Sequence, residues 1–278
     1  MVAGSNLVAP TNKKTAYSIR PSFLYSPETT LNILLTNDDG INALGIKVLA
    51  QYLERIGKVS IVAPDRERSA VGHALTLHHP LRAAKLDENI YAVDGTPTDC
   101  VNLGINSLLS IKPDIVISGI NHGANLGDDI TYSGTVSAAM EATLMGIPAF
   151  AISLATTTET DNFIPAASFA AKLAGVIIRH GLPSDTFLNV NVPNHSPELL
   201  KKPLITCQGK RSYEGMIINN IDPRGRNYYW IGSVDLNFHD VEGTDYHAVT
   251  RGHISITPLH LDLTNYSSFR ELESWDIS

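Results

Sequence analysis

The sequence predicts an α/β fold in which a sheet of mostly parallel strands lies between two layers of helices. From residue 31 onward, short apolar runs of strand length alternate with segments whose apolar residues recur at helical spacing. Strands that alternate with helices form parallel sheets, with the crossover helices on both faces. After about residue 200 the long helical segments stop, and short β-rich runs lie between proline and glycine turns. This second pattern predicts an antiparallel β appendage on the α/β core.

The first part of the core begins with a strand and a helix. The apolar run Leu31–Thr36 predicts a buried strand. Apolar residues then recur at helical spacing from Ile41 to Ile56, and Gly57 is expected to end this helix. Two β-branched runs, Val59–Ala63 and Ile90–Val93, predict the next strands.

The same alternation continues to about residue 200 and then changes. Pro97 stands where a helix tolerates proline, in its first turn, and opens the next predicted helix. The remaining core elements are expected as strands at Asp114–Ser118, Ala149–Leu154 and Phe187–Val192 and as helices at Thr135–Met145 and Ala166–His180. The appendage is expected to hold strands at Met216–Asn219, Tyr228–Gly232 and His253–Thr257.

Residues 1–30 differ from the rest in composition. They are rich in Ser, Thr, Asn and Pro, and they hold no acidic residue before Glu28. No continuous apolar run is present, so a secretory signal is not expected. A disordered or extended segment is the favoured interpretation, and organellar targeting stays open. We therefore divide the chain into this segment, a catalytic core over 31–200 and the β appendage over 201–278.

Composition excludes several classes of partner. The chain has 278 residues and a net charge of −7, which argues against a surface for long nucleic acid. Its apolar runs are too short to cross a bilayer, so no membrane partner is expected. The two cysteines, Cys100 and Cys207, have no zinc-site spacing and are expected to be reduced thiols. These features predict a cytoplasmic protein.

Oxygen-bearing side chains follow three of the predicted strands. In an open parallel sheet, ligands bind beyond the carboxyl ends of the strands. Asp38, Asp39 and Gly40 follow the first strand, Ser69 lies in the loop after the second, and Asn121 follows the strand at Asp114–Ser118. We expect these side chains to meet at one edge of the sheet.

This set of oxygens predicts one divalent metal ion. Two adjacent carboxylates at the end of an apolar strand repel each other and lose water, and a cation relieves both penalties. The hydroxyl of Ser69 and the amide oxygen of Asn121 would complete an oxygen shell that suits Mg²⁺ or Mn²⁺. Taken singly, Asp38 and Asp39 could form a solvated turn with a helix cap, while Ser69 and Asn121 could stabilise loops. Their joint placement favours Asp38, Asp39, Ser69 and Asn121 as metal ligands.

The loop that leads into the helix at Thr135 is the candidate phosphate site. Ser133, Gly134 and Thr135 would place hydroxyl groups and free amides where the helix dipole favours an anion. Ordinary capping by Ser133 or Thr135 is the alternative. His122, beside Asn121, is a candidate general acid for the leaving-group oxygen, and a simple loop histidine is its alternative.

Motifs for other chemistries do not occur. The first strand is not followed by G-x-G-x-x-G, and the chain has neither a G-x-x-x-x-G-K-[ST] loop nor a G-x-S-x-G elbow. We therefore predict a metal-dependent phosphomonoesterase in which Asp38 or Asp39 orients the attacking water. Two alternatives stay open: a nucleotide-binding regulator without catalysis, and a transferase that uses nucleotide-sugar donors.

Motifs along most of the chain resemble those of the survival protein SurE family. The resemblance runs in order from about residue 31 to about residue 265. It is carried by Asn37–Gly40 (NDDG), Ala63–Ser69 (APDRERS), Gly95–Cys100 (GTPTDC), Ser118–Asn121 (SGIN), Tyr132–Thr135 (YSGT), Asp222–Gly225 (DPRG), Tyr229–Gly232 (YWIG), Gly243–Asp245 (GTD) and Ser255–Leu259 (SITPL).

This resemblance implies a Rossmann-like core with 5′-nucleotidase activity, which also extends to 3′-nucleotides and short polyphosphate. It implies the same four metal ligands, phosphate contacts at 133–135, and a C-terminal extension that exchanges arms to form a homodimer or homotetramer. Many members continue Gly-Ala-Ser after the position of Ser69, whereas this chain has Ala70–His73 (AVGH), so the lip of the substrate pocket differs. Arg224, Arg226 and Tyr228–Trp230 could stack on a base or meet polyphosphate, or they could form a hairpin at a subunit contact.

Overall fold

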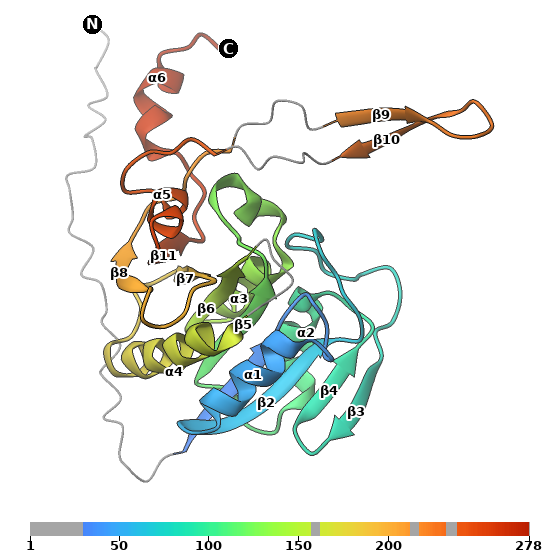
Figure 1. The fold of residues 1–278 in the computed structure, drawn as a ribbon, viewed down its shortest axis with the longest axis vertical. Coiled ribbons are helices and arrows are strands. Elements are labelled where there is room, and N and C mark those ends of the chain that lie inside the picture. Colours follow the sequence, from blue (N-terminus) through green and yellow to red (C-terminus); the bar gives the residue numbers. More distant parts are fainter. Residues whose placement is uncertain (1–29, 157–161, 212–216, 232–237, 278) are drawn as a thin grey trace, which may run out of the picture.

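A mixed nine-stranded sheet forms the centre of the molecule (Figure 1). The computed structural model describes residues 30–156, 162–211, 217–231 and 238–277. The strands lie in the order β3-β4-β2-β1-β5-β6-β7-β11-β8. Their bounds are β1 Leu31–Thr36, β2 Gly57–Pro64, β3 Ala83–Asp87, β4 Ile90–Val93, β5 Ile115–His122, β6 Ala149–Ala155, β7 Thr186–Pro193, β8 Lys201–Ile205 and β11 His253–His260.

Most neighbouring strands run parallel, as the sequence predicts. From β4 through β2, β1, β5 and β6 to β7, every pairing is parallel. Antiparallel pairing occurs where β3 joins β4 and where β11 joins β7. The carboxyl ends of β1, β2 and β5 therefore lie at the same edge of the sheet.

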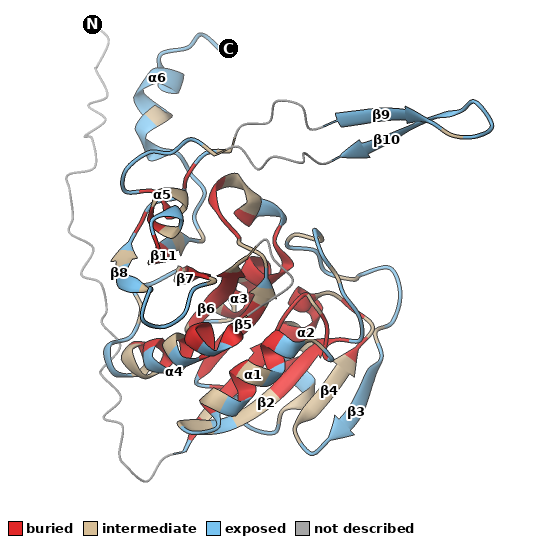
Figure 2. Ribbon diagram, viewed as in Figure 1, coloured by how far each residue is buried: buried red, intermediate tan, exposed pale blue. Residues whose placement is uncertain are grey.

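Helices cover both faces of the sheet. Helices α1 (Leu44–Leu53) and α4 (Phe163–His180) pack on one face, while α2 (Pro97–Leu103) and α3 (Gly134–Leu144) pack on the other. Strand β1 is continuously apolar because it is buried on both faces. Ile33 and Leu35 pack into the core on the side of α1 and α4, and Leu34 packs into the core on the side of α2 and α3. Figure 2 shows this buried centre between the helical layers. The three-layer arrangement predicted from the sequence is confirmed.

Several element bounds differ from the prediction. Gly57 begins β2 and does not merely end the preceding helix. Strand β5 extends beyond the predicted Asp114–Ser118, because pairing with β6 shifts register after Ser118 and resumes at Asn121. Asn121 and His122 therefore lie in the strand and not in a following loop. Strands β3 and β8 were not predicted: every residue of β3 is exposed, so no apolar alternation marks it.

Residues 201–278 contribute to two different parts of the molecule. Strands β8 and β11 extend the central sheet, whereas β9 (Ile217–Ile221) and β10 (Asn227–Ile231) form an antiparallel hairpin that projects away from it (Figure 1). Short helices α5 (Asp245–Thr250) and α6 (Phe269–Glu273) complete this segment. The predicted strand residues Met216 and Gly232, and residues 1–29 of the predicted N-terminal segment, lie outside the described residues.

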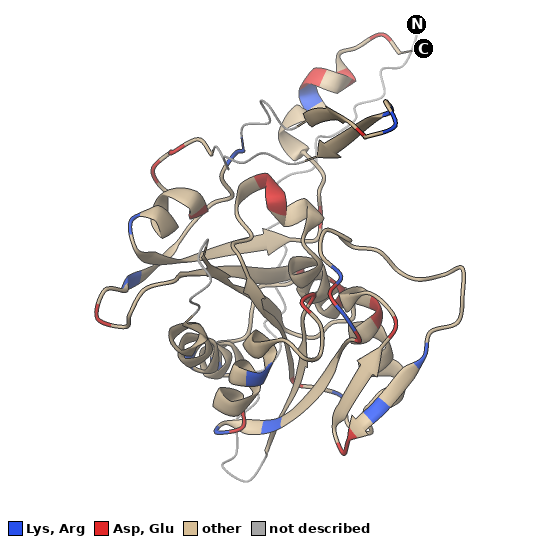
Figure 3. Cartoon of the chain, turned by 45° about the vertical axis from the view of Figure 1, so that its right-hand side comes forward, with Lys and Arg blue, Asp and Glu red and all other residues tan. Residues whose placement is uncertain are grey.

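Helix α4 and the distribution of charged residues both bear on the predicted partners. Helix α4 is long and apolar enough to cross a membrane by composition, with a mean hydropathy of 1.2. Its buried residues, from Phe163 to Ile177, pack into the core beside α1, so it is a core helix of the fold. Lys and Arg residues are dispersed over several elements, with Asp and Glu among them (Figure 3).

Candidate functional site

The carboxyl ends of β1, β2 and β5 open into one cavity of about 990 Å³. Asp38 and Asp39 come from the turn after β1, and Ser69 comes from the loop after β2. Asn121 and His122 lie at the end of β5. The structure therefore brings all four predicted metal ligands, and the candidate acid His122, to the wall of a single cavity.

The turn after β1 depends on Gly40. Its φ of +95° belongs to the left-handed region, and a Cβ added there would lie 2.9 Å from the carbonyl carbon of Arg66. The Asn37 side-chain amide donates to the Gly40 carbonyl at 3.0 Å and closes the turn. The backbone can thus reverse directly after the strand, with Asp38 and Asp39 held between Asn37 and Gly40.

The N-terminus of α3 holds the Asp38 carboxylate in place. The Thr135 backbone amide donates to Asp38 Oδ2 at 3.1 Å, and the Thr135 hydroxyl donates to Oδ1. A Cβ added at Gly134 would lie 3.0 Å from the Asp38 Cβ, so the helix approaches closely only because this residue is glycine. Asp38 is consequently almost fully buried, with 5% of its surface exposed.

The predicted phosphate-binding residues differ in their access to the cavity. Ser133 lines it and is the N-cap of α3, with its hydroxyl accepting from the Val136 amide at 3.1 Å. Thr135 is fully buried, and its hydroxyl donates a hydrogen bond to Asp38. The capping alternative for Ser133 is therefore observed, while phosphate binding at Ser133, Gly134 and Thr135 stays a prediction.

Burial raises the pKa values of both aspartates, and nearby negative charge adds to the effect. Burial raises the pKa of Asp38 above its usual 3.8, and the hydrogen bonds from Thr135 oppose this effect. Burial, followed by the negative charge of Asp38, raises the pKa of Asp39 to about 6. The His122 backbone amide, which donates to Asp39 Oδ2 at 3.1 Å, partly offsets the increase. Two desolvated carboxylates side by side are a combination that a bound cation stabilises.

Ser69 and Asn121 use their donors in hydrogen bonds to neighbouring residues. The Ser69 hydroxyl donates to Glu67 Oε1 at 2.6 Å, and the Asn121 side-chain amide donates to the Gly123 carbonyl at 2.8 Å. The lone pairs of the Ser69 hydroxyl and of the Asn121 amide oxygen therefore remain for a cation. Among the described residues no three His, Cys, Asp or Glu side chains are placed to hold a metal. A cation at this site would thus need these two neutral oxygens, and the donor set fits Mg²⁺ or Mn²⁺.

The sequence prediction did not include several residues of the cavity wall. Glu67 could have been suspected, because it lies two residues before Ser69 in a loop already assigned to this edge. Tyr132 directly precedes Ser133 and belongs to the motif Tyr132–Thr135, so it too could have been suspected. Leu44, Asn162 and Phe163 reach the cavity through tertiary packing. The additional lining side chains include those of Leu44, Glu67, Asn125, Asp129, Tyr132, Asn162 and Phe163.

The C-terminal segment supports the loop that precedes α3. The buried carboxylate of Asp245 accepts from the backbone amides of Gly127 and Gly209 at 2.8 and 2.9 Å. In the same loop, Asp128 accepts from the Arg211 backbone amide at 3.0 Å, and Asp129 pairs with the Arg211 guanidinium. Because Asp129 also lines the cavity, the segment after residue 200 supports part of the site wall.

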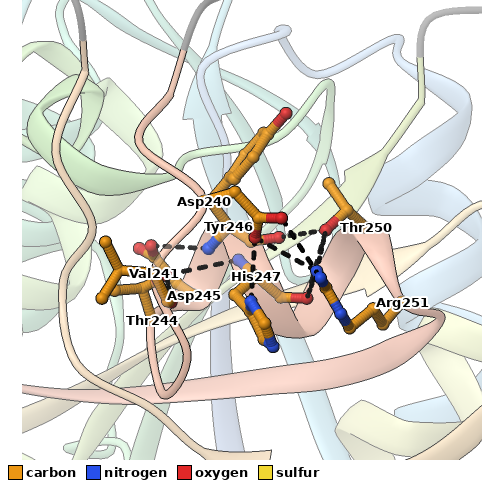
Figure 4. A network of polar contacts seen from close by, with 8 residues as sticks. All are labelled: Asp240, Val241, Thr244, Asp245, Tyr246, His247, Thr250 and Arg251. Atoms are coloured by element: carbon orange, nitrogen blue, oxygen red, sulfur yellow. Dashed lines mark hydrogen bonds and ion pairs between the residues drawn. The ribbon is translucent and has the colours of Figure 1, made fainter.

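The turn around Asp245 is itself cross-linked by polar contacts. Figure 4 shows Asp240 facing His247 and Arg251, next to the start of α5. Asp240 Oδ1 lies 2.8 Å from His247 Nδ1 and 3.1 Å from Arg251 Nη1. Thr244 caps α5, with its hydroxyl accepting from the His247 amide at 3.3 Å. These contacts fix the start of α5, from which the Asp245 carboxylate reaches Gly127.

Comparison with known proteins identifies the family of the chain. The family model described as "Survival protein SurE" matches residues 33–215. The 5′-nucleotidase SurE of Geotalea uraniireducens is 69% identical over 248 residues, covering 89% of this chain and 100% of that protein. The 5′-nucleotidase SurE of Geobacter sulfurreducens is 66% identical, covering 89% of this chain and 95% of that protein. The crystal structure of the SurE protein from Aquifex aeolicus matches with a TM-score of 0.79 at 48% identity, over 87% of this chain and 98% of that one. The chain belongs to the survival protein SurE family.

Proposed function

We propose that this protein is a metal-dependent 5′-nucleotidase that hydrolyses nucleoside 5′-monophosphates to a nucleoside and phosphate. The observation that carries the proposal is the meeting of Asp38, Asp39, Ser69 and Asn121 at one cavity. Two desolvated carboxylates there are flanked by neutral oxygens with free lone pairs. The 5′-nucleotidase name of relatives up to 69% identical over most of the chain supports the same activity.

Each residue has a defined part in this mechanism. One Mg²⁺ or Mn²⁺ ion per subunit would neutralise the substrate phosphate and activate the attacking water. Asp38 and Asp39 would hold the ion. Asp39, whose carboxylate does not share the Thr135 hydrogen bonds of Asp38, would orient the water. The amides near Ser133, at the start of α3, hold phosphate oxygens as their charge redistributes. His122 lines the cavity, and we assign it the protonation of the leaving oxygen.

Glu67 extends this assignment. Its carboxylate accepts a hydrogen bond from the Ser69 hydroxyl, and its charge contributes to raising the pKa values of Asp38 and Asp39. We assign Glu67 the role of orienting Ser69, so that the hydroxyl lone pairs face the cavity. The substrate range is proposed to include 3′-nucleotides and short polyphosphate. The proposed location of the protein is the cytoplasm.

The test is phosphate release from AMP by the purified full chain. We expect turnover with added Mn²⁺ or Mg²⁺ and its loss in chelator, with recovery when the metal is restored. A panel of 5′- and 3′-nucleotides and tripolyphosphate then defines the substrate range. Absence of phosphate release from every monophosphate under all metals would contradict the proposal, and consumption of nucleotide sugars without phosphatase activity would favour a transferase.

The projecting hairpin is proposed to mediate self-association. Its side chains are unusually exposed for apolar residues: Trp230 is 63% exposed and Ile231 is 81% exposed. Isolated two-stranded hairpins are marginal in water, and exposed apolar surfaces of this kind mark protein contacts. We expect a homodimer or homotetramer by light scattering, and a monomer when Trp230 and Ile231 are both replaced by Ser.

A further inference from the structure

A second cavity, of about 470 Å³, lies on the other side of the loop after β2. Its wall includes Arg66, Arg68 and Arg82 together with His79, and the single lining carboxylate is that of Asp94. The first cavity is lined by Glu67 and Ser69 from the same loop. Alternate residues of one short segment therefore line an acidic cavity and a basic cavity.

Arg66 and Arg68, which line this second cavity, keep N–H donors beyond those they use within the protein. Arg68 donates to the Asp94 backbone carbonyl at 2.8 Å, and its buried Nε has no hydrogen-bond partner within the described chain. Arg66 Nε pairs with Asp65 at 3.1 Å. Each guanidinium carries five N–H donors, so both groups retain several.

Asp94 does not neutralise the cavity. Its Oδ1 accepts the Arg82 backbone amide at 2.8 Å, whereas the Arg82 guanidinium remains 3.9 Å from Oδ2. At this distance the Arg82 guanidinium makes an ion pair but no hydrogen bond with Asp94. Three positive side chains thus line the cavity with one carboxylate, that of Asp94, which is already engaged by backbone and by a distant guanidinium. Asp65, which is not part of the lining, forms ion pairs with Arg66 at 3.1 Å and with Arg68 at 3.7 Å.

We propose that this basic cavity is a second anion site, which binds phosphate or condensed phosphate separately from the metal site. Guanidinium forks match the oxygens of phosphoryl groups, and three forks from two segments can hold a tetrahedral anion from several directions. The cavity is much larger than one such anion, so it has room for more than one linked phosphoryl group. The proposal goes beyond the phosphatase activity and does not depend on it.

The test measures anion binding to the metal-free full chain in chelator, where the phosphatase reaction does not run. Inorganic phosphate and tripolyphosphate are titrated separately by calorimetry. Comparing the two titrations shows whether the cavity binds free phosphate or condensed phosphate. The double variant R66Q/R82Q removes two guanidinium groups and leaves the half-buried Arg68 in place. We expect its affinity for at least one probe to fall at least about tenfold, because charge-assisted hydrogen bonds are lost.

The double variant R55Q/K85Q is the matched control. It also removes two positive charges, but from exposed positions outside the cavity. Arg55 lies over the ring of Tyr52, and Lys85 lies over the ring of Tyr91. We expect it to bind both probes with the affinity of the unchanged chain. Phosphate release from AMP with Mn²⁺ should be unchanged in both double variants, which separates this proposal from the proposed function. The proposal is overturned if neither probe binds, if R66Q/R82Q binds both probes normally, or if R55Q/K85Q loses as much affinity.

Discussion

The Asp245 carboxylate accepts a hydrogen bond from the Gly127 backbone amide at 2.8 Å, although 118 positions separate the two residues. Its other oxygen accepts from the amides of Gly209 and Tyr246 at 2.9 and 2.8 Å. Both oxygens of a fully buried carboxylate are therefore used as acceptors. The contact joins the C-terminal segment to the turn that leads towards α3 and the proposed metal site.

Replacing Asp245 by Asn should destabilise the protein and disturb the site. An amide NH₂ in place of either oxygen would face a backbone N–H, so at least one buried donor would lose its acceptor. We expect the free energy of unfolding to fall by about 1–3 kcal/mol, measured by urea denaturation. The same substitution at exposed Asp240 should cost clearly less, because its ion pairs with His247 and Arg251 are solvated. Equal stability of the Asp245 variant and the unchanged chain would refute the assignment.

Replacing Asp38 by Asn should remove turnover while preserving the fold. The substitution takes away one of the two charges that hold the cation and leaves the volume unchanged. We expect kcat for AMP with Mn²⁺ to fall by at least about a hundredfold, with an unchanged circular dichroism spectrum. Asp87→Asn, at an exposed position on β3, is the control and should retain full activity. Near-normal turnover by the Asp38 variant would show that its assigned role is wrong.

Gly40→Ala tests the turn that brings the two aspartates together. An alanine here would have to adopt a φ of +95°, and its Cβ would lie 2.9 Å from the Arg66 backbone. Gly243→Ala is a matched control, since its φ is +88° and no atom lies within 4 Å of the added Cβ. We expect the control to cost about 1–2 kcal/mol of stability from strain alone. Gly40→Ala should cost at least about 1 kcal/mol more and should also weaken Mn²⁺ binding, which calorimetry can measure.

Cation binding should weaken as the pH falls through about 6. Burial and the Asp38 charge raise the pKa of Asp39 from 3.8 to about 6, and a cation binds the ionised carboxylate. Below this pKa, Mn²⁺ affinity should decline by up to about tenfold per pH unit. A Mn²⁺ affinity that stays constant between pH 5 and pH 7 would contradict this expectation.

The same raised pKa sets the sign of the stability change in the metal-free protein. Because the folded pKa of Asp39 lies above its unfolded value, folding favours the protonated carboxyl. This contribution is fully present below about pH 4 and is lost as the pH rises through about 6. In chelator, the melting temperature should therefore fall as the pH rises over this window. The fall should be smaller in Asp39→Asn, which lacks the titrating carboxyl.

The spacing of apolar residues along the sequence predicted the core elements and the edge of the sheet where the cavity lies. Strand β1 was predicted with its observed bounds, because a strand buried on both faces is continuously apolar. Strand β3 lacked any such signal, since it is an exposed edge strand. Strand β5 was predicted too short, because its register shift after Ser118 depends on pairing with β6 and not on local sequence.

The site was predictable to the extent that it follows strand ends. Asp38 and Asp39 lie in the turn after β1 and Ser69 lies in the loop after β2, so their convergence follows from the parallel topology. Tyr132 and Phe163 reach the same cavity from a turn and a helix that tertiary packing places there. Arg82 likewise joins Arg66 only through the position of the β3 edge, which the sequence did not reveal.

The position of β11 between β7 and β8 has a consequence for synthesis of the chain. In the described sheet β8 is an edge strand whose neighbour is β11, a segment made some fifty residues later. A nascent chain that has not yet emerged past residue 253 leaves the edge of β7 open and β8 unpaired. Open edges of this kind recruit other strands, so prematurely terminated translation products should be prone to aggregation.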